Sequence, residues 1–160
     1  MSSFHVRMLR RSFCIASNYT SPVGARYRTA AVNRDGGDGV SSVIGGLEVA
    51  VSSPLARAFD PTASNPEQLL ALAWVTCLNA TAQAVVKGGR RTAVRVEVEL
   101  HPSAVGSGYE FHVDAYLSAE GASIEETADI LTAAHARCPV SKLLAAASTV
   151  HVHPEDYRAG

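Results

Sequence analysis

This 160-residue chain has few cysteines and almost no net charge. Its three cysteines are too few for the disulfide framework of a small secreted domain. The formal net charge is only −1, which removes the main electrostatic argument for nucleic-acid binding. No apolar run approaches the roughly 20 residues that span a bilayer. We therefore expect neither a nucleic acid nor a membrane as a partner.

The composition otherwise indicates a folded protein. Hydrophobic residues make up 47% of the chain and charged residues 18%, so disorder is excluded for most of it. The length suits one domain with a substantial core, predicted over residues 19–160. A cytoplasmic location with a small number of working thiols fits this composition best.

Residues 1–18 differ from the rest, because they carry three arginines and no acidic residue. This segment is predicted to be a loosely ordered extension, and its composition leaves organelle targeting open. Cys14 lies within it and is not expected to be catalytic.

A long helix is predicted from Asn65 to Lys87. Asn65 is a good N-cap, Pro66 suits the first helical position, and Gly88 follows as a stop signal. Its interior is apolar nearly all round, which is typical of a helix that is buried on most sides. A subunit interface is a natural way to cover it.

Strands and further helices surround this segment. Alternating residues predict strands near 47–52, an antiparallel pair over 94–100 and 109–117 with one wet face, and a short strand around 150–152. Ser123 caps a second helix, which breaks at Cys138 before Pro139 opens a third. The order of these elements indicates an α+β fold.

Two cysteines lie in the most helix-like stretches. Cys138 precedes a helix, where free amides and the dipole favour a thiolate. Cys77 lies mid-helix among apolar residues, so burial would make it inert unless a cation is brought to it from elsewhere. The alternative is that both are ordinary core cysteines. No metal site or bound cofactor is expected, because His151 and His153 lack further ligands and the glycines form no phosphate-binding motif.

Three sequence features carry a family resemblance: Asn-Pro-Glu-Gln-Leu at 65–69, Cys77, and Cys-Pro-Val-Ser at 138–141. Together they resemble the OsmC/organic hydroperoxide resistance (Ohr) family, and the resemblance covers roughly residues 19–153. The resemblance implies antiparallel sheets packed around a long buried central helix, in an intertwined homodimer with active sites at the subunit interface. It also implies a peroxidase that reduces alkyl and fatty-acid hydroperoxides to alcohols. The expected reductant is an external dithiol, such as a lipoylated protein or dihydrolipoamide.

Roles follow from the resemblance at each matching position. Cys77 corresponds to the peroxidatic cysteine, Cys138 to the resolving cysteine and Glu67 to the active-site glutamate. Arg26 corresponds to the activating arginine, with Arg28 as the fallback. The Ohr branch is favoured by residues 47–54, whereas residues 138–142 are more similar to the OsmC branch. An OsmC-branch peroxidase and a non-catalytic binding protein on the same fold remain the alternatives.

Helix geometry adds an expectation about assembly. Glu67 and Cys77 are ten residues apart, which is about 15 Å along a helix axis. Either the helix breaks, or a neighbouring chain or the arginine loop bridges the gap. An apolar pocket with contributions from Trp74, Leu78 and Phe59 is predicted to favour organic hydroperoxides.

Overall fold

A computed structural model of the chain describes residues 24–158. The contacts divide the chain into two units, Met1–Ala30 and Ala31–Gly160. All helices and strands described below belong to the second unit. The predicted extension at residues 1–18, including Cys14, lies outside the described residues.

A small antiparallel sheet precedes the first helix. Its strands are β1 (Ala31–Asn33), β2 (Gly39–Val43) and β3 (Glu48–Val51), paired in that order. The β1–β2 turn depends on Gly39, which has a φ of 118°. A Cβ atom there would lie 2.5 Å from the Asp35 side chain, whose carboxylate accepts a hydrogen bond from the Val40 amide. Any other residue would therefore strain this turn.

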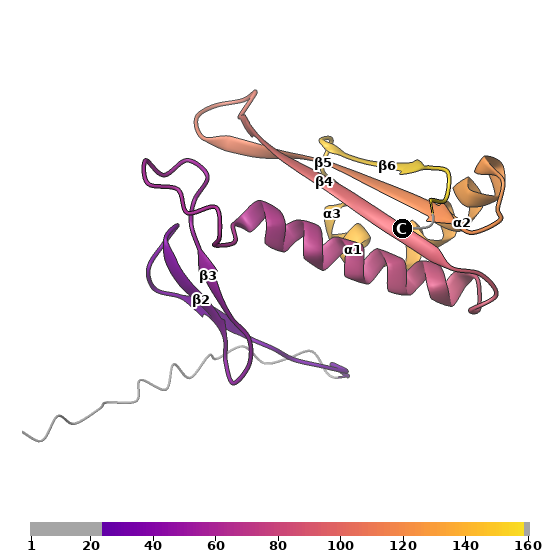
Figure 1. Cartoon of the computed structure of the whole chain (residues 1–160), viewed down its shortest axis with the longest axis horizontal. Coiled ribbons are helices and arrows are strands. Elements are labelled where there is room, and N and C mark those ends of the chain that lie inside the picture. Colours follow the sequence, from indigo (N-terminus) through magenta and orange to yellow (C-terminus); the bar gives the residue numbers. More distant parts are fainter. Residues whose placement is uncertain (1–23, 159–160) are drawn as a thin grey trace, which may run out of the picture. The chain divides into compact units, whose positions relative to one another are not determined.

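The second sheet is formed by β4 (Thr92–Pro102), β5 (Tyr109–Ala119) and β6 (Val150–Pro154). Strands β4 and β5 pair antiparallel along their whole length, as the alternating sequence predicts. Strand β6 lies on the other side of β5 and runs parallel to it (Figure 1). A parallel connection needs a long crossover, and α2 and α3 supply it between β5 and β6.

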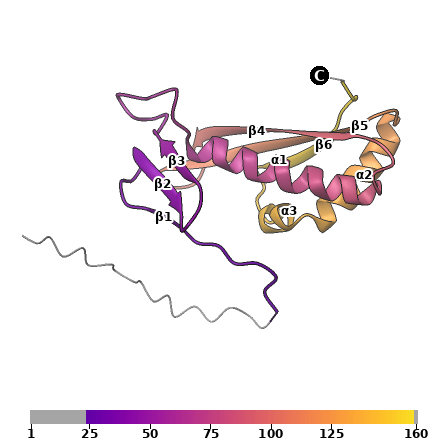
Figure 2. The same cartoon turned by 60° about the horizontal axis from the view of Figure 1, so that its bottom comes forward.

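Helices α1 and α2 pack on this second sheet, and α3 packs against both of these helices (Figure 2). Helix α1 (Pro66–Val85) begins where predicted, because the Asn65 side chain accepts a hydrogen bond of 2.9 Å from the Gln68 amide. It ends two residues before Lys87, which adopts a left-handed φ of 53°. Helix α2 (Ile124–Arg137) has the predicted capping box of Ser123 and Glu126, and α3 (Pro139–Leu144) follows directly after Cys138.

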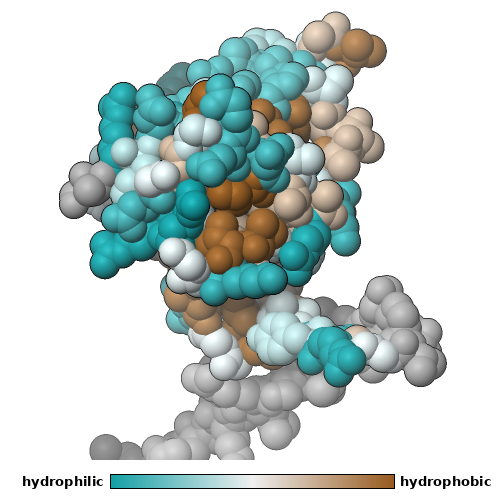
Figure 3. Space-filling view, turned by 90° about the vertical axis from the view of Figure 1, so that its right-hand side faces the viewer, coloured by the Kyte–Doolittle hydropathy of each residue, from teal (hydrophilic) through white to brown (hydrophobic). Residues whose placement is uncertain are grey.

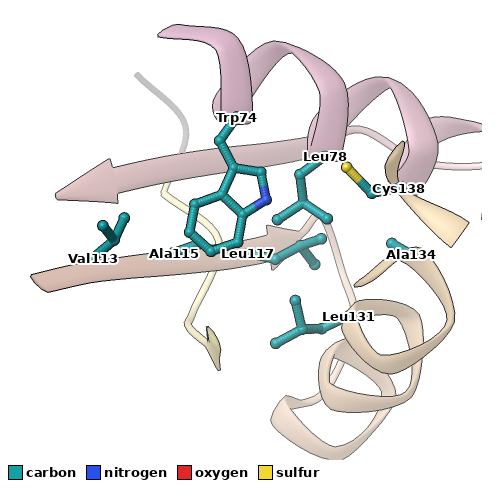
Figure 4. Close-up of a cluster of buried hydrophobic side chains, with 9 residues drawn as sticks. Trp74, Leu78, Val113, Ala115, Leu117, Leu131, Ala134 and Cys138 are labelled. Carbon is teal, nitrogen blue, oxygen red and sulfur yellow. The ribbon is translucent and has the colours of Figure 1, made fainter. Parts of the chain in front are cut away.

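The core lies between α1 and the second sheet. Trp74 and Leu78 point from α1 toward Val113, Ala115 and Leu117 of β5, and Leu131 and Ala134 of α2 close the cluster (Figure 4). Burying a leucine or valine side chain of this cluster stabilises the fold by about 1.5–3 kcal/mol. The α+β architecture predicted from the sequence is therefore confirmed, with its core on the predicted apolar face of β5.

The prediction that α1 is buried on most sides is wrong for the single chain. Only Trp74, Leu78 and Ala82 are fully buried. A stripe at helical spacing is exposed instead, formed by Leu72, Ala73, Thr76, Ala80 and Ala84. The small residues on this stripe leave the backbone accessible to another packing surface.

The expectation about membrane-length segments also needs correction. By length and composition alone, α1 could cross a bilayer, although it contains several polar residues. The core helix of a water-soluble domain meets the same criterion, and one face of α1 packs on β4 and β5. That packing favours the interpretation as a core helix.

The surface near the end of α1 combines apolar and charged side chains. Figure 3 shows apolar side chains framed by hydrophilic ones on this side of the molecule. A pocket there is lined by Val85, Val86 and Ile130 together with Arg90 and Glu126. Arg90 and Glu126 form an ion pair at 3.7 Å, which ties the end of α1 to the start of α2.

Candidate active site

The sulfur atoms of Cys77 and Cys138 lie 3.3 Å apart and share a hydrogen bond. Both cysteines are free. A disulfide has an S–S distance of about 2.05 Å, so a small side-chain movement would join them. Sixty-one positions separate the two cysteines in the sequence, and the fold alone brings them together.

Secondary structure places each sulfur. Cys77 lies in the middle of α1, where its backbone is fixed by the helix. Cys138 is the single residue between α2 and α3, in an extended conformation with φ −65° and ψ 123°. The following Pro139 disfavours helical geometry at Cys138, and the Cys138 amide still donates to the Ala134 carbonyl at 2.8 Å. The break predicted at this position is confirmed.

The two thiols have opposite acid–base properties. Burial raises the pKa of Cys77, and the hydrogen bond to Cys138 adds to that effect because it favours the protonated form. Burial on its own also raises the pKa of Cys138, but hydrogen bonds from the Ser141 hydroxyl and from the amides of Ser141 and Val140 lower it overall. The pKa of Cys138 is therefore the lower of the two.

Glu67 lies in the first turn of α1, half-buried. Its Oε2 atom is shielded from solvent and has no hydrogen-bond partner among the described residues. A carboxylate oxygen shielded from water in this way needs a hydrogen-bond donor. Because α1 is continuous from Pro66 to Val85, a helix break does not bring Glu67 to Cys77. A neighbouring chain and the arginine loop remain as the two alternatives.

The predicted arginines lie in the first unit. Arg26 and Arg28 are exposed and outside any helix or strand. The role of Arg26, with Arg28 as the fallback, stays a prediction.

Comparison with known proteins decides the family. A match to the family described as OsmC-like protein covers residues 59–153. The chain belongs to the OsmC-like protein family. This OsmC-like chain is 31% identical over 125 residues to the organic hydroperoxide resistance protein-like protein of Mycoplasma pneumoniae, which covers 74% of this chain and 86% of that protein.

Two further similarities place the chain near the Ohr proteins. It is 33% identical over 100 residues to the organic hydroperoxide resistance protein OhrA of Bacillus subtilis, covering 60% of this chain and 70% of OhrA. The crystal structure of OhrB from the same species superposes with a TM-score of 0.72 at 25% identity, covering 83% of this chain and all of OhrB. The predicted OsmC/Ohr fold is thereby confirmed.

The predicted substrate pocket is wrong in its lining. Trp74 and Leu78 are completely buried in the core of this OsmC-like chain, so neither can contact a substrate as the fold stands. Phe59 is exposed in the loop before α1. A pocket of about 370 Å³ instead lies at the start of α1, lined by Pro66 and Leu69 of α1 and by Val51 and Gly37 among others.

Sequence reasoning missed Ser141. It is fully buried, three residues after Cys138, and its hydroxyl accepts a hydrogen bond of 2.9 Å from the Trp74 indole. The signal that could have found it is the Cys-x-x-Ser spacing across a helix start, which turns the serine back toward the cysteine.

Within residues 24–158 no group of three or more histidine, cysteine or acidic residues is arranged to hold a metal ion.

Proposed function

We propose that this OsmC-like protein is a thiol-dependent peroxidase that reduces organic hydroperoxides to alcohols through a two-cysteine cycle. The observation that carries the proposal is the 3.3 Å separation of the Cys77 and Cys138 sulfurs. A sulfenic acid formed on one would lie in contact with a thiolate on the other. The organic hydroperoxide resistance proteins among its relatives support the substrate class.

In the proposed cycle the Cys77 thiolate attacks the terminal oxygen of the hydroperoxide. The O–O bond breaks, the alkoxide takes up a proton to leave as an alcohol, and Cys77 becomes a sulfenic acid. The Cys138 thiolate then attacks the Cys77 sulfur, the S–O bond breaks, and hydroxide leaves as water after protonation. The disulfide is returned to two thiols by exchange with an external dithiol, for which a lipoyl group is our proposal.

Cys77 requires activation in this scheme, because burial raises its pKa. We assign Arg26 as the cation that favours the Cys77 thiolate. Glu67 would anchor the guanidinium through a charge-assisted hydrogen bond, and its shielded, unpartnered Oε2 atom supports that role. No bound cofactor enters the reaction.

A homodimer completes the proposed site. The exposed stripe of α1, from Leu72 to Ala84, would pack against a second copy of the chain. Within one chain, the continuous helix α1 leaves roughly 15 Å along its axis between Glu67 and Cys77. Pairing could instead bring Glu67 of one subunit to the sulfurs of the other. The pocket at the start of α1 would then accept the organic part of the substrate. A cytoplasmic location stays our prediction.

Within the family we favour the Ohr branch, which the names of the relatives support. The Cys-Pro-Val-Ser phrase at 138–141 keeps an OsmC-branch peroxidase as the alternative. The preferred hydroperoxide would separate the two branches.

Replacement of the proposed nucleophile tests the function. Cys77→Ser should abolish reduction of an alkyl hydroperoxide, whereas Cys14→Ser should retain it because that cysteine has no part in the cycle. Consumption of the hydroperoxide is measured with a dithiol as reductant. Unchanged turnover in Cys77→Ser would contradict the proposal.

A non-catalytic binding protein is the second candidate. It predicts that brief peroxide treatment of the wild-type protein yields no Cys77–Cys138 disulfide, whereas the peroxidase cycle requires one. Mass spectrometry of the peptides that contain these cysteines separates the two candidates.

A further inference from the structure

A buried hydrogen bond between two side chains links α1 to α3. The Trp74 indole N–H donates to the Ser141 hydroxyl oxygen at 2.9 Å, and both side chains are at most 1% exposed. Among the described residues no other hydrogen bond joins a side chain of α1 to a side chain of α3. In Figure 4 the indole nitrogen faces the side of the core on which Cys138 lies.

The spacing of this bond matches the spacing of the sulfur pair. Trp74 lies three residues before Cys77 on α1, and Ser141 lies three residues after Cys138 at the start of α3. Residues three apart on a helix share a face and are separated by about one turn. The hydrogen bond and the 3.3 Å sulfur contact therefore join the same two segments at neighbouring positions.

Helix α3 depends on its contacts with the rest of the fold. It has only six residues, and an isolated helix of that length is not stable in water. Its one fully buried residue is Ser141, a polar side chain. The Cys138 amide donates to Ala134 of α2, and the Cys138 carbonyl accepts from the Lys142 amide of α3. The position of Cys138 therefore follows the position of α3 on α1.

A hydrogen bond fixes the position of α3 better than an apolar contact does. It forms only within a narrow range of distance and angle, whereas apolar neighbours such as Val140 and Leu144 can slide with little loss. A displaced α3 would also leave the Trp74 N–H unpaired in the core, which is unfavourable. The contact between Trp74 and Ser141 is thus suited to set a position.

We propose that Trp74 and Ser141 are positioning residues that hold the Cys138 sulfur within reach of the Cys77 sulfur. The inference rests on the proposed function for its purpose, which is closure of the disulfide. In that step the Cys138 thiolate attacks the sulfenic sulfur of Cys77, the S–S bond forms, the S–O bond breaks, and hydroxide leaves. Reacting atoms are well placed at about 3–3.5 Å, and a misplacement of about 1 Å can slow a reaction about a hundredfold.

The test measures how strongly the folded protein favours the Cys77–Cys138 disulfide, and it needs no hydroperoxide. Full-length protein with Cys14→Ser retains only these two thiols. It is equilibrated with mixtures of reduced and oxidised dithiothreitol and then alkylated, and mass spectrometry of the oxidised fraction gives the equilibrium constant.

Trp74→Phe and Ser141→Ala should each lower this constant about tenfold, because the dithiol form loses its alignment whereas the disulfide imposes it. A tenfold change corresponds to about 30 mV in the reduction potential.

Matched variants separate positioning from a general loss of packing. Thr92→Val removes another largely buried hydroxyl, which links α1 to β4 through Asn79 and Gln83, and it should leave the constant unchanged. The double variant Trp74→Phe/Ser141→Ala should fall no further than either single variant, since both changes remove the same bond.

Three results would overturn the positioning role: constants equal to the background in both single variants, additive effects in the double variant, or an equal fall in Thr92→Val. A background protein that forms no disulfide overturns it too. If Trp74→Phe does not fold, Ser141→Ala decides alone. Constants that fall as expected in a protein without hydroperoxide turnover would refute the proposed function and leave the positioning role intact.

Discussion

At the scale of single residues, the sulfur pair combines a favourable distance with an unfavourable order of pKa values. Cys77 and Cys138 lie 3.3 Å apart, yet burial raises the pKa of Cys77, the proposed nucleophile. The pKa of Cys138, the proposed resolving residue, is lowered, which favours the thiolate that its step requires. The first chemical step therefore depends on a group that lowers the pKa of Cys77.

Removal of Arg26 tests that dependence. Burial favours the neutral thiol of Cys77, so without a cation its thiolate forms only at higher pH. Arg26→Ala should lose most peroxidase activity at neutral pH and regain part of it as the pH rises. The measurement is the pH–rate profile, with Arg28→Ala as the matched control.

The two arginine variants have distinct outcomes. A profile displaced to higher pH in Arg28→Ala alone would transfer the activating role to Arg28. Profiles that coincide with the wild type in both variants would exclude activation by either arginine.

The site was predictable from the sequence only in part. The phrases around Cys77 and Cys138 carry the family resemblance, and the Pro139 break indicated a thiol at a helix start. The contact between Trp74 and Ser141 spans 67 positions, and no local pattern encodes a contact at such a distance. The same long range explains why Trp74 was predicted to line a pocket but lies in the core.

At the scale of secondary structure, α1 is the element that positions the site, because it carries both Glu67 and Cys77. Its start was predictable from Asn65 and Pro66, which act within one turn. The end of α1 was harder to predict, because Val86 and Lys87 are acceptable helix residues and only the backbone turn at Lys87 stops the helix. The parallel pairing of β6 with β5 depends on how α2 and α3 cross the sheet, which strand alternation cannot reveal.

The N-cap of α1 should contribute measurably to stability. Asn65→Ala removes the acceptor of the Gln68 amide and should lower the free energy of unfolding by about 1 kcal/mol. Asn65→Asp keeps the acceptor and should remain close to the wild type. Urea denaturation at a fixed protein concentration provides the measurement, and equal midpoints for the Ala and Asp variants would show that the cap contributes nothing.

At the scale of the whole molecule, the exposed stripe of α1 is a surface suited to a partner. Leu72 is 60% exposed on this stripe, next to the small residues Ala73 and Thr76. An apolar and narrow helix face of this kind permits close packing of a second helix. The predicted homodimer would use it.

A charge on that stripe should dissociate the dimer. Leu72→Glu would place an unpaired carboxylate in the interface and should shift the protein from dimer to monomer. Sedimentation velocity measures this shift. Leu143→Glu is the matched control, because Leu143 on α3 is even more exposed, at 82%, and lies off the stripe. Identical sedimentation of Leu72→Glu and the wild type would place the interface elsewhere.

Trp74 is the only tryptophan in the chain, and its indole donates a hydrogen bond to Ser141, which lies three residues after Cys138 of the sulfur pair. The fluorescence of an indole depends on its immediate polar and sulfur neighbours, and here those neighbours change when a thiolate becomes a disulfide. The protein thus contains its own optical reporter of oxidation. Stopped-flow emission could follow the formation and reduction of the disulfide within a single turnover, without a label and without altering any residue of the site.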